Sequence, residues 1–137
     1  MNQLSGKIIQ CAKTVYKELG PGFAECIYHR AFAYELQDNG FKIESKRTIP
    51  IQYKEYNVGF GEADIVVHDE CLVENRIEPC LIIVELKAIA GNISEKEKSQ
   101  INTYRKNING VTKGLIINFP QPSTNTVKEE IDYLEIE

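Results

Sequence analysis

The sequence lacks any long apolar stretch and any group of residues with the spacing of a zinc site. Its longest apolar run, Cys80–Val84, has five residues, a fraction of the roughly 20 that a membrane-spanning helix needs. The N-terminal residues lack the apolar core of a secretion signal. The four cysteines form no C-x-x-C pair and have no histidine at zinc spacing. We therefore expect a cytoplasmic protein without a membrane partner, and reduced structural cysteines, because the cytosol disfavours disulfides.

Two common kinds of catalytic site are missing as well. No serine–histidine or cysteine–histidine pattern is present, so a nucleophilic triad has no support. The Gly20-Pro21-Gly22 stretch is not a phosphate-binding loop, since it lacks the lysine and the preceding strand that such a motif requires. We expect His29 and His68 to be surface or partly buried residues, not catalysts.

The net charge of −4 argues at first against a nucleic-acid partner. The acids are concentrated, however, because residues 69–78 and 128–137 hold 9 of the 20 acids and only 2 of the 16 bases. The remaining residues carry 14 bases and 11 acids. A local basic surface that binds phosphate is therefore allowed, although the charge does not itself indicate one.

No internal repeat, low-complexity tract or linker divides the chain, so we expect a single domain over 1–137 with a real core. Apolar residues three to four apart predict a helix over 4–19, which the glycines and proline at 20–22 end. A second helix is expected over 23–37, before the stop signal Asp38-Asn39-Gly40. Its apolar face is expected to be wide, with two lines of residues: Ala24, Ile27, Ala31 and Tyr34, and Tyr28, Phe32 and Leu36.

From residue 41 the pattern becomes that of strands. Residues 42–53 predict an outer strand, broken or bulged near Pro50. After an acidic loop at 69–78, residues 80–88 are apolar on both faces up to Glu85, as in a central strand. Residues 58–67 alternate, and this predicts two faces: Phe60, Glu62, Asp64 and Val66 on one, and Gly61, Ala63, Ile65 and Val67 on the other.

Helical character returns over 94–109, where Ser94 and Glu97 form a capping-box pattern. A strand is predicted at 111–119 and a short last one at 131–136. The element order α-α-β-β-β-α-β, with an optional final strand, predicts an α/β fold. Its centre is a mixed β-sheet of four to five strands flanked by helices.

Three residues on the predicted strands can carry chemistry. Glu85 and Lys87, two residues apart, project to the same side about 6–7 Å from each other; alone, they are more often an ion pair at a strand end. Asp64 changes this interpretation, because a hairpin can bring its carboxylate beside Glu85. Two such carboxylates repel unless they are protonated or bridged by a cation, and with water they form the ligand set that Mg²⁺ prefers. Lys87 can then stabilise charge on a phosphoryl group or orient the attacking water.

This arrangement resembles the PD-(D/E)XK nuclease superfamily, whose core is a helix, three strands, a helix and a strand. The resemblance covers about residues 4–119, with Asp64 and Glu85 as the strand acids and Lys87 as the lysine. It departs at Ala63, where proline is frequent. It implies a restriction-endonuclease-like core and a Mg²⁺ or Mn²⁺ ion bound by Asp64, Glu85 and the backbone carbonyl of Leu86.

A second stretch, Gly22-Phe23-Ala24-Glu25-Cys26-Ile27-Tyr28, resembles the signature of the GxxExxY proteins within this superfamily. Glu25 matches the superfamily's glutamate on the helix before the first strand. The resemblance implies that Glu25 is a catalytic residue and a ligand of the metal or its water. From the residues alone, Glu25 is equally well explained as a carboxylate favoured by the helix dipole, with Tyr28 in the core.

Gln100-Ile101-Asn102-Thr103-Tyr104 fits the Q-x-x-x-Y pattern of RecB-like members of the superfamily. Gln100 and Tyr104 share a helical face, where an amide and a phenol can bind a nucleic-acid phosphate or a metal-bound water. The alternative is a tyrosine packed on the sheet and a glutamine in solvent.

Two functions follow. The first is a nuclease that uses Mg²⁺ or Mn²⁺ to hydrolyse phosphodiester bonds of DNA or RNA. At this size, gripping a duplex from both sides would take a homodimer or a larger DNA-processing partner. The second is a non-catalytic module that keeps the nuclease fold and binds nucleic acid or protein, which the acidic surface suggests. The intact acids and lysine favour the enzyme, because a binding module gains nothing from clustered like charges.

Overall fold

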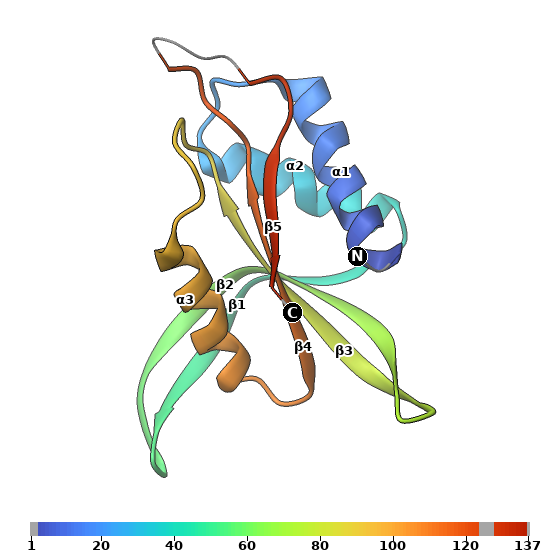
Figure 1. Ribbon diagram of the computed structural model, residues 1–137, viewed down its shortest axis with the longest axis vertical. Coiled ribbons are helices and arrows are strands. Elements are labelled where there is room, and N and C mark those ends of the chain that lie inside the picture. The colour runs from blue at the N-terminus through green and yellow to red at the C-terminus, as the bar shows by residue number, and fades with distance from the viewer. Residues whose placement is uncertain (1–2, 124–127, 137) are drawn as a thin grey trace.

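A computed structural model describes residues 3–123 and 128–136, with the backbone alone at 3–4, 71–73 and 111. The helices are α1 (Gln3–Leu19), α2 (Glu25–Asp38) and α3 (Glu95–Lys106), and the strands are β1 (Lys42–Tyr53), β2 (Tyr56–Val73), β3 (Arg76–Lys87), β4 (Val111–Asn118) and β5 (Asp132–Ile136) (Figure 1). The predicted α/β fold, with a mixed sheet flanked by helices, is confirmed, and the optional last strand is present. None of the helices in the described ranges is long and apolar enough to cross a membrane.

The five strands form one sheet in the order β1-β2-β3-β4-β5. All neighbouring strands are antiparallel except β3 and β4, which are parallel. A parallel pair needs a crossover connection, and α3 lies in the one between β3 and β4. The chain therefore leaves the end of β3, forms α3 and returns to run beside β3 again.

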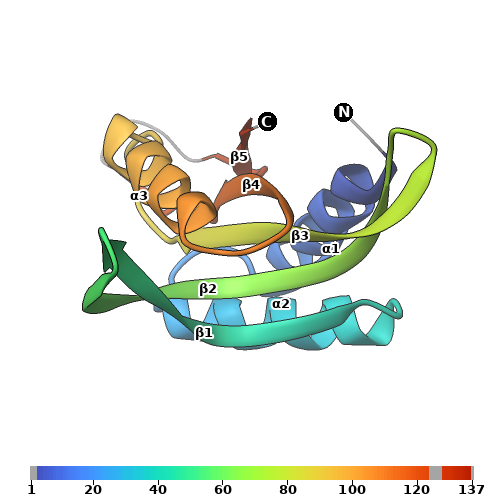
Figure 2. The ribbon, with the colours of Figure 1, turned by 90° about the horizontal axis from the view of Figure 1, so that it is seen from below.

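The helices pack on opposite faces of the sheet. Residues of α1 and α2 pack in one core with Ile65 and Val84, and α3 packs in a second core with Ala63 and Ile83. Figure 1 shows α1 and α2 together, with α3 apart from them beside β1 and β2. In Figure 2, α3 lies over the end of the β1–β2 ribbon nearest to its turn.

The strict alternation predicted for β2 is wrong at Asp64. Ala63 packs in the core of α3, but Ile65, two residues on, packs in the core of α1 and α2. On β1 the same change occurs between Ile43 and Ile49. Lys46, which lies on β1 between the partners of Ile65 and Ala63, has φ = 54°. A left-handed residue of this kind rotates a strand, so the side chains after it change faces.

The acidic loop predicted at 69–78 is also not a loop. β2 and β3 stay paired up to Val73 and Arg76, joined by Glu74 and Asn75. Both turn residues have positive φ, 49° and 64°, as in the two-residue turns that suit a twisted hairpin. The acidic composition of residues 69–78 is typical of a loop, and for this reason the extended hairpin was not predicted.

Of two smaller expectations, one is confirmed and one is wrong. The irregularity expected near Pro50 is present, between Ile51 and Gln52. The apolar face of α2 is narrower than predicted, because Ile27 and Tyr34 are exposed and only the line of Tyr28, Phe32 and Leu36 is fully buried.

The cysteines also differ from expectation. Cys80 is disulfide-bonded, and the side chain of Cys71 lies outside the described residues. Cys11 is free and buried, whereas Cys26 is free and exposed. Cys80 lies on the predicted strand and pairs with Asp69 on a stretch of β2 that was expected to be a loop, and its disulfide contradicts the expected reduced state.

Two glycines let α3 lie close against the sheet. A Cβ atom at Gly61 on β2 would collide with the ring of Tyr104, and one at Gly114 on β4 would collide with Ile101. Tyr104 and Ile101 are the two buried side chains of α3. The contact of this helix with the sheet therefore requires residues without a side chain at both positions.

We expect Gly61→Ala to lower the free energy of unfolding by about 1–3 kcal/mol, because an added methyl group overpacks a fixed ring. Gly59→Ala is the matched control: Gly59 lies on the same strand, and nothing lies within 4 Å of a Cβ atom built there. Denaturant unfolding of both variants measures the difference. Equal stability would show that α3 does not rest on Gly61.

Candidate active site

The sheet opens into a fork at Asp64 and Glu85. The backbone pairing of β2 with β3 ends at Ile65 and Val84. Beyond that point β2 continues beside β1, and β3 continues beside β4 as far as Lys87. The two strands therefore diverge where the predicted acids stand.

At the fork, each of the two acids binds the backbone of the opposite strand. The Leu86 N–H donates to Asp64 Oδ2 at 2.8 Å, and the Asp64 N–H donates to Glu85 Oε1 at 3.4 Å. The side-chain oxygens of Asp64 and Glu85 thus replace the backbone hydrogen bonds between β2 and β3, which end at Ile65 and Val84. Asp64 and Glu85 lie side by side, as the chemistry inferred from the sequence requires.

Glu85 is buried, with 4% of its surface exposed. Burial, and after it the neighbouring Asp64 carboxylate, raises the pKa of Glu85 to about 8, while Lys87 acts in the opposite sense. A buried carboxyl beside a second one keeps its proton because two adjacent negative charges are unfavourable. A divalent cation relieves the same repulsion, so these oxygens, completed by water, suit Mg²⁺.

Lys87 approaches an acid that the sequence analysis did not assign to the site. Its Nζ lies 3.9 Å from Glu97 Oε1 on the first turn of α3. Glu97 forms the predicted capping box with Ser94: it accepts the Ser94 N–H at 2.9 Å and also the Ser94 hydroxyl. These bonds, the hydroxyl first, hold the pKa of Glu97 below its usual value. The start of α3 therefore places a negative charge beside Lys87.

The backbone around Lys87 is fixed by the end of β4. The Lys87 carbonyl accepts the Phe119 N–H at 2.8 Å. The side chain of Asn118, fully buried, accepts the Ile89 N–H at 3.0 Å and donates to the Ile89 carbonyl at 3.1 Å. The chain that leaves the fork after Lys87 is thus held by hydrogen bonds.

Glu25 is delivered by the turn between α1 and α2. Gly20 and Gly22 have φ of 70° and 105°, which only glycine adopts without strain. The buried Tyr28 phenol donates to the Gly20 carbonyl at 2.7 Å and accepts the Phe23 N–H at 3.4 Å. The turn is therefore tied to the helix that it precedes, and Glu25 becomes the first residue of that helix.

In this position the Glu25 carboxyl is subject to the charges at the fork. Its pKa is raised, first by partial loss of water and then by Asp64, and Lys87 opposes the rise. The residue itself is exposed. We call this exposed first turn of α2, which lies within range of the charges of Asp64 and Lys87, the rim of the site.

Gln100 and Tyr104 are bonded to each other on α3. Gln100 Nε2 donates to the Tyr104 hydroxyl at 2.9 Å. The Tyr104 ring is buried against Gly61, and Gln100 is exposed. The ring therefore has a packing role, while its hydroxyl and the amide form one polar group on the side of α3 that faces β2.

Asp64, Glu85 and Lys87 lie together at the fork, and Glu97 lies beside Lys87. Among the described residues, no group of three or more His, Cys, Asp or Glu side chains has the arrangement of a metal site. An ion held by Asp64 and Glu85 would need water for its remaining ligands. Glu97, Asn118 and Gly61 were missed because only their contacts across the fold reveal them; the Ser94–Glu97 spacing was visible, but it indicated only a cap.

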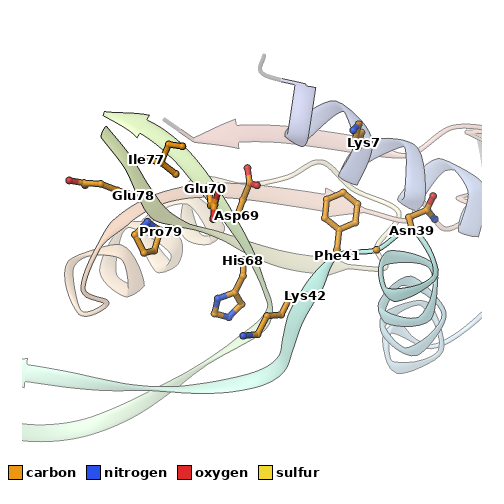
Figure 3. A pocket seen from close by; sticks show the side chains of 11 residues that line it. Lys7, Asn39, Phe41, Lys42, His68, Asp69, Glu70, Ile77, Glu78 and Pro79 are labelled. Carbon is orange, nitrogen blue, oxygen red and sulfur yellow. The ribbon is translucent and has the colours of Figure 1, made fainter. Parts of the chain in front are cut away.

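A separate hollow of about 610 Å³ lies away from the fork. It is bounded by Lys7 on α1, Phe41 before β1, and the β2–β3 hairpin (Figure 3). Lys42 and His68, paired across β1 and β2, line it together with acids of the hairpin. None of the residues predicted for the site takes part in it.

The chain matches the family model described as the PD-(D/E)XK nuclease superfamily over residues 2–131. No curated protein and no solved structure matches it. The matched span includes the turn before α2, both arms of the fork and α3.

The raised pKa of Glu85 makes stability without metal depend on pH. Between the ordinary value of 4.5 and about 8, the folded protein holds a proton that the unfolded chain has released. The free energy of unfolding should therefore fall as the pH rises through this range. We expect Glu85→Gln, which stays neutral, to overtake the wild type by on the order of 2–4 kcal/mol near pH 8.5. Denaturant unfolding in EDTA at pH 5 to 8.5 measures this, and parallel profiles would contradict it.

Proposed function

The chain belongs to the PD-(D/E)XK nuclease superfamily, and on this premise we propose that it is a metal-dependent nuclease that hydrolyses phosphodiester bonds of DNA or RNA. The contact between Asp64 and Glu85 at the fork carries the proposal, because a buried carboxylate beside a second carboxylate needs a proton or a cation between them. Lys87, two residues further along, supplies a positive charge at the same place.

We propose that Asp64, Glu85 and the backbone carbonyl of Leu86 hold one Mg²⁺ or Mn²⁺ ion, and that Glu25 holds a water or the ion from the rim. When bound, such an ion polarises a phosphate oxygen and activates water. The Leu86 N–H holds Asp64 in place, so that carboxylate is oriented before an ion or substrate arrives. Asp64, Glu85 and Leu86 thus lie on strands that the sheet already fixes, whereas Glu25 lies on α2.

Lys87 is proposed to stabilise the negative charge that develops on the attacked phosphoryl group. Its ammonium lies near Glu97 at 3.9 Å, longer than a close ion pair, and this leaves donors for a phosphate oxygen. The bonded Gln100 and Tyr104 are proposed to contact the nucleic-acid backbone beside it. In this proposal the residues at the fork hydrolyse the phosphodiester bond, and α3 positions the nucleic-acid strand.

We also propose that the chain is a member of the GxxExxY group with a RecB-like Q-x-x-x-Y helix. The contacts of Tyr28 support the first assignment, since they give the spaced residues a shared purpose: Gly22 turns the chain, Tyr28 ties the turn and Glu25 reaches the rim. The Gln100–Tyr104 hydrogen bond supports the second.

The nuclease proposal is tested by cleavage of single- and double-stranded DNA and RNA with Mg²⁺, Mn²⁺ or EDTA. We expect cleavage with metal only, and losses on the order of 10²-fold or more for Asp64→Asn and Lys87→Met, because each removes a charge at the reacting phosphate. Glu62→Gln is the matched control for Asp64→Asn: it makes the same acid-to-amide change two residues away on β2, at an exposed side chain.

Two results would sink the proposal. One is that the folded wild type cleaves none of the four substrates with either metal, which would leave a non-catalytic module. The other is cleavage that survives both substitutions, which would place the activity elsewhere or in a contaminant.

The metal site is tested without catalysis by Mn²⁺ binding, measured by calorimetry or by the loss of the free-ion EPR signal. We expect a single site in the wild type and at least 10-fold weaker binding in Asp64→Asn and Glu85→Gln, since each loses an anionic ligand. Lys87→Met should retain or tighten the site, because a nearby positive charge is removed. Equal affinity in all four proteins would refute the proposed ligands.

A further inference from the structure

A small hollow lies between α2 and β1, which run alongside each other (Figure 2). Its volume is about 280 Å³. This leaves room for a phosphate group with part of its nucleotide, but it is less than the roughly 300–1,000 Å³ of sites that enclose a whole drug-sized ligand. His29 and Arg30 line the hollow from α2, and Ser45 and Lys46 line it from β1. None of these four residues is among those placed at the fork.

The lining of this hollow carries positive charge without a matching acid. Arg30 and Lys46 are exposed cations, and in the described part of the chain neither forms an ion pair with a carboxylate. No aspartate or glutamate is among the described residues that line the hollow. The larger hollow of Figure 3, by contrast, has Asp69, Glu70 and Glu78 in its lining. A guanidinium and an ammonium that are both unpaired suit an anion, and phosphate in particular.

Uncharged polar groups complete the lining. The buried His29 has its Nε2 2.6 Å from the Ser45 Oγ, and this hydrogen bond joins α2 to β1 at the hollow. Burial lowers the pKa of His29, and the cations Lys46 and Arg30 act in the same direction. His29 is therefore neutral near pH 7. The Ser45 hydroxyl and the Gln37 amide add hydrogen-bond donors of the kind that phosphate oxygens accept.

The backbone of Lys46 has a conformation that is unusual for a lysine. Its φ of 54° lies in the left-handed region, where residues with a side chain are uncommon. If rotation of β1 were the only requirement, glycine would meet it without strain. Conformations of this kind gather at functional sites, because the surrounding structure has to hold them. The position therefore indicates that the lysine side chain itself is needed at the hollow.

The hollow lies next to the fork. Lys46 lies on β1 between the partners of Ala63 and Ile65, so the strand that lines the hollow is the neighbour of the strand that bears Asp64, about 5 Å away between backbones. Asp64 and Glu62, which lie outside the lining, are near enough to oppose the lowering of the His29 pKa. A nucleic acid carries a phosphate on every nucleotide, so a strand with one phosphate at the fork can place another in the hollow.

We propose that the hollow lined by Arg30, Lys46 and Ser45 is a phosphate subsite, which binds a second phosphate group of the nucleic acid that occupies the fork. This rests on the proposed nuclease function and deepens it, because it names a contact that fixes the substrate strand away from the bond that is cut. Arg30 and Lys46 bind the phosphate oxygens. The His29 Nε2–H donates to the Ser45 oxygen, which leaves the Ser45 hydroxyl proton for the phosphate.

The two histidines of the chain report on the hollow without catalysis. Their ring C–H signals are followed by NMR in EDTA at fixed pH, while single-stranded or duplex DNA or RNA oligonucleotides, or inorganic phosphate, are added. We expect at least one oligonucleotide to shift the His29 signals and to leave those of His68, whose Nε2 lies 2.9 Å from Glu44, nearly unchanged. Equal shifts at both histidines would overturn the proposal. So would a His29 that responds to no oligonucleotide, and a response to inorganic phosphate alone would assign the hollow to a free anion.

Substitutions test the two cations. Asparagine tolerates a left-handed backbone, so Lys46→Asn removes the charge and keeps the strand; Arg30→Gln removes the other charge. We expect each to weaken oligonucleotide binding on the order of 10-fold. Each should also reduce the steepness of log K against log salt concentration by roughly 0.7–0.9, the value for one phosphate contact. Unchanged affinity and salt dependence in both variants would overturn the proposal.

Two further variants serve as controls. Lys46→Arg, which keeps the charge, should bind as the wild type does. Lys42→Asn makes the same change at another exposed lysine of β1, one that lines the hollow of Figure 3 instead, and it should leave binding nearly unchanged. Weakening by Lys42→Asn equal to that by Lys46→Asn would show a general effect of charge and overturn the proposal. Circular dichroism confirms that each variant is folded.

Neutral methylphosphonate linkages, introduced one at a time into the oligonucleotide, locate the bound phosphate. One linkage should weaken binding to the wild type without weakening binding to Lys46→Asn further, because both changes remove the same contact. A terminal phosphate whose contribution depends on Lys46 in this way would identify the end of the strand as the occupant. If no phosphate of the oligonucleotide is coupled to Lys46, the proposal is wrong.

The outcomes also separate this inference from the nuclease proposal. Binding that depends on Lys46 and Arg30, without cleavage under any metal, would support the phosphate subsite and refute the nuclease. Cleavage together with binding that is unchanged in Lys46→Asn and Arg30→Gln would refute the subsite and leave the nuclease standing.

Discussion

The structure of the site depends on two carboxylates that take over the hydrogen bonding between β2 and β3. Where the backbone ladder stops, Asp64 accepts the Leu86 N–H and Glu85 accepts the Asp64 N–H. Two acids can be held this close only because the strands fix their backbones, and burial then keeps a proton on Glu85. The same oxygens therefore join the strands and form the proposed cation site.

Other elements approach this pair from three directions, each held by its own hydrogen bonds. Tyr28 secures the turn that carries Glu25. Asn118 holds the chain that follows Lys87 through both polar groups of Ile89. The capping box at the start of α3 orients Glu97 toward Lys87. These supports lie on separate elements, so the geometry of the fork is set by the whole fold rather than by a single loop, as preorganised sites require.

Local patterns predicted most of the fold. Helical spacing identified all three helices, the Ser94–Glu97 pair identified the start of α3, and the apolar run before Glu85 and Lys87 placed both near the end of β3. Prediction failed where a distant partner decides the outcome. The left-handed Lys46 reverses the faces of β1 and β2, and no periodicity signals this. From the sequence, Glu97 was predicted only to cap α3. Its contact with Lys87 joins residues from different elements, and no local pattern indicates it. The family resemblance supplied Glu25, whose position at the rim depends on a turn of two glycines.

The change of faces along β2 has a consequence for how the molecule behaves as a whole. One strand contributes Ile65 and Val67 to the core of α1 and α2, and Ala63 and Val66 to the core of α3. Neither helical layer can loosen without disturbing the strand on which the other rests. The two layers should therefore melt together, and a fragment ending before α3 would lose the packing partner of the segment that bears Asp64.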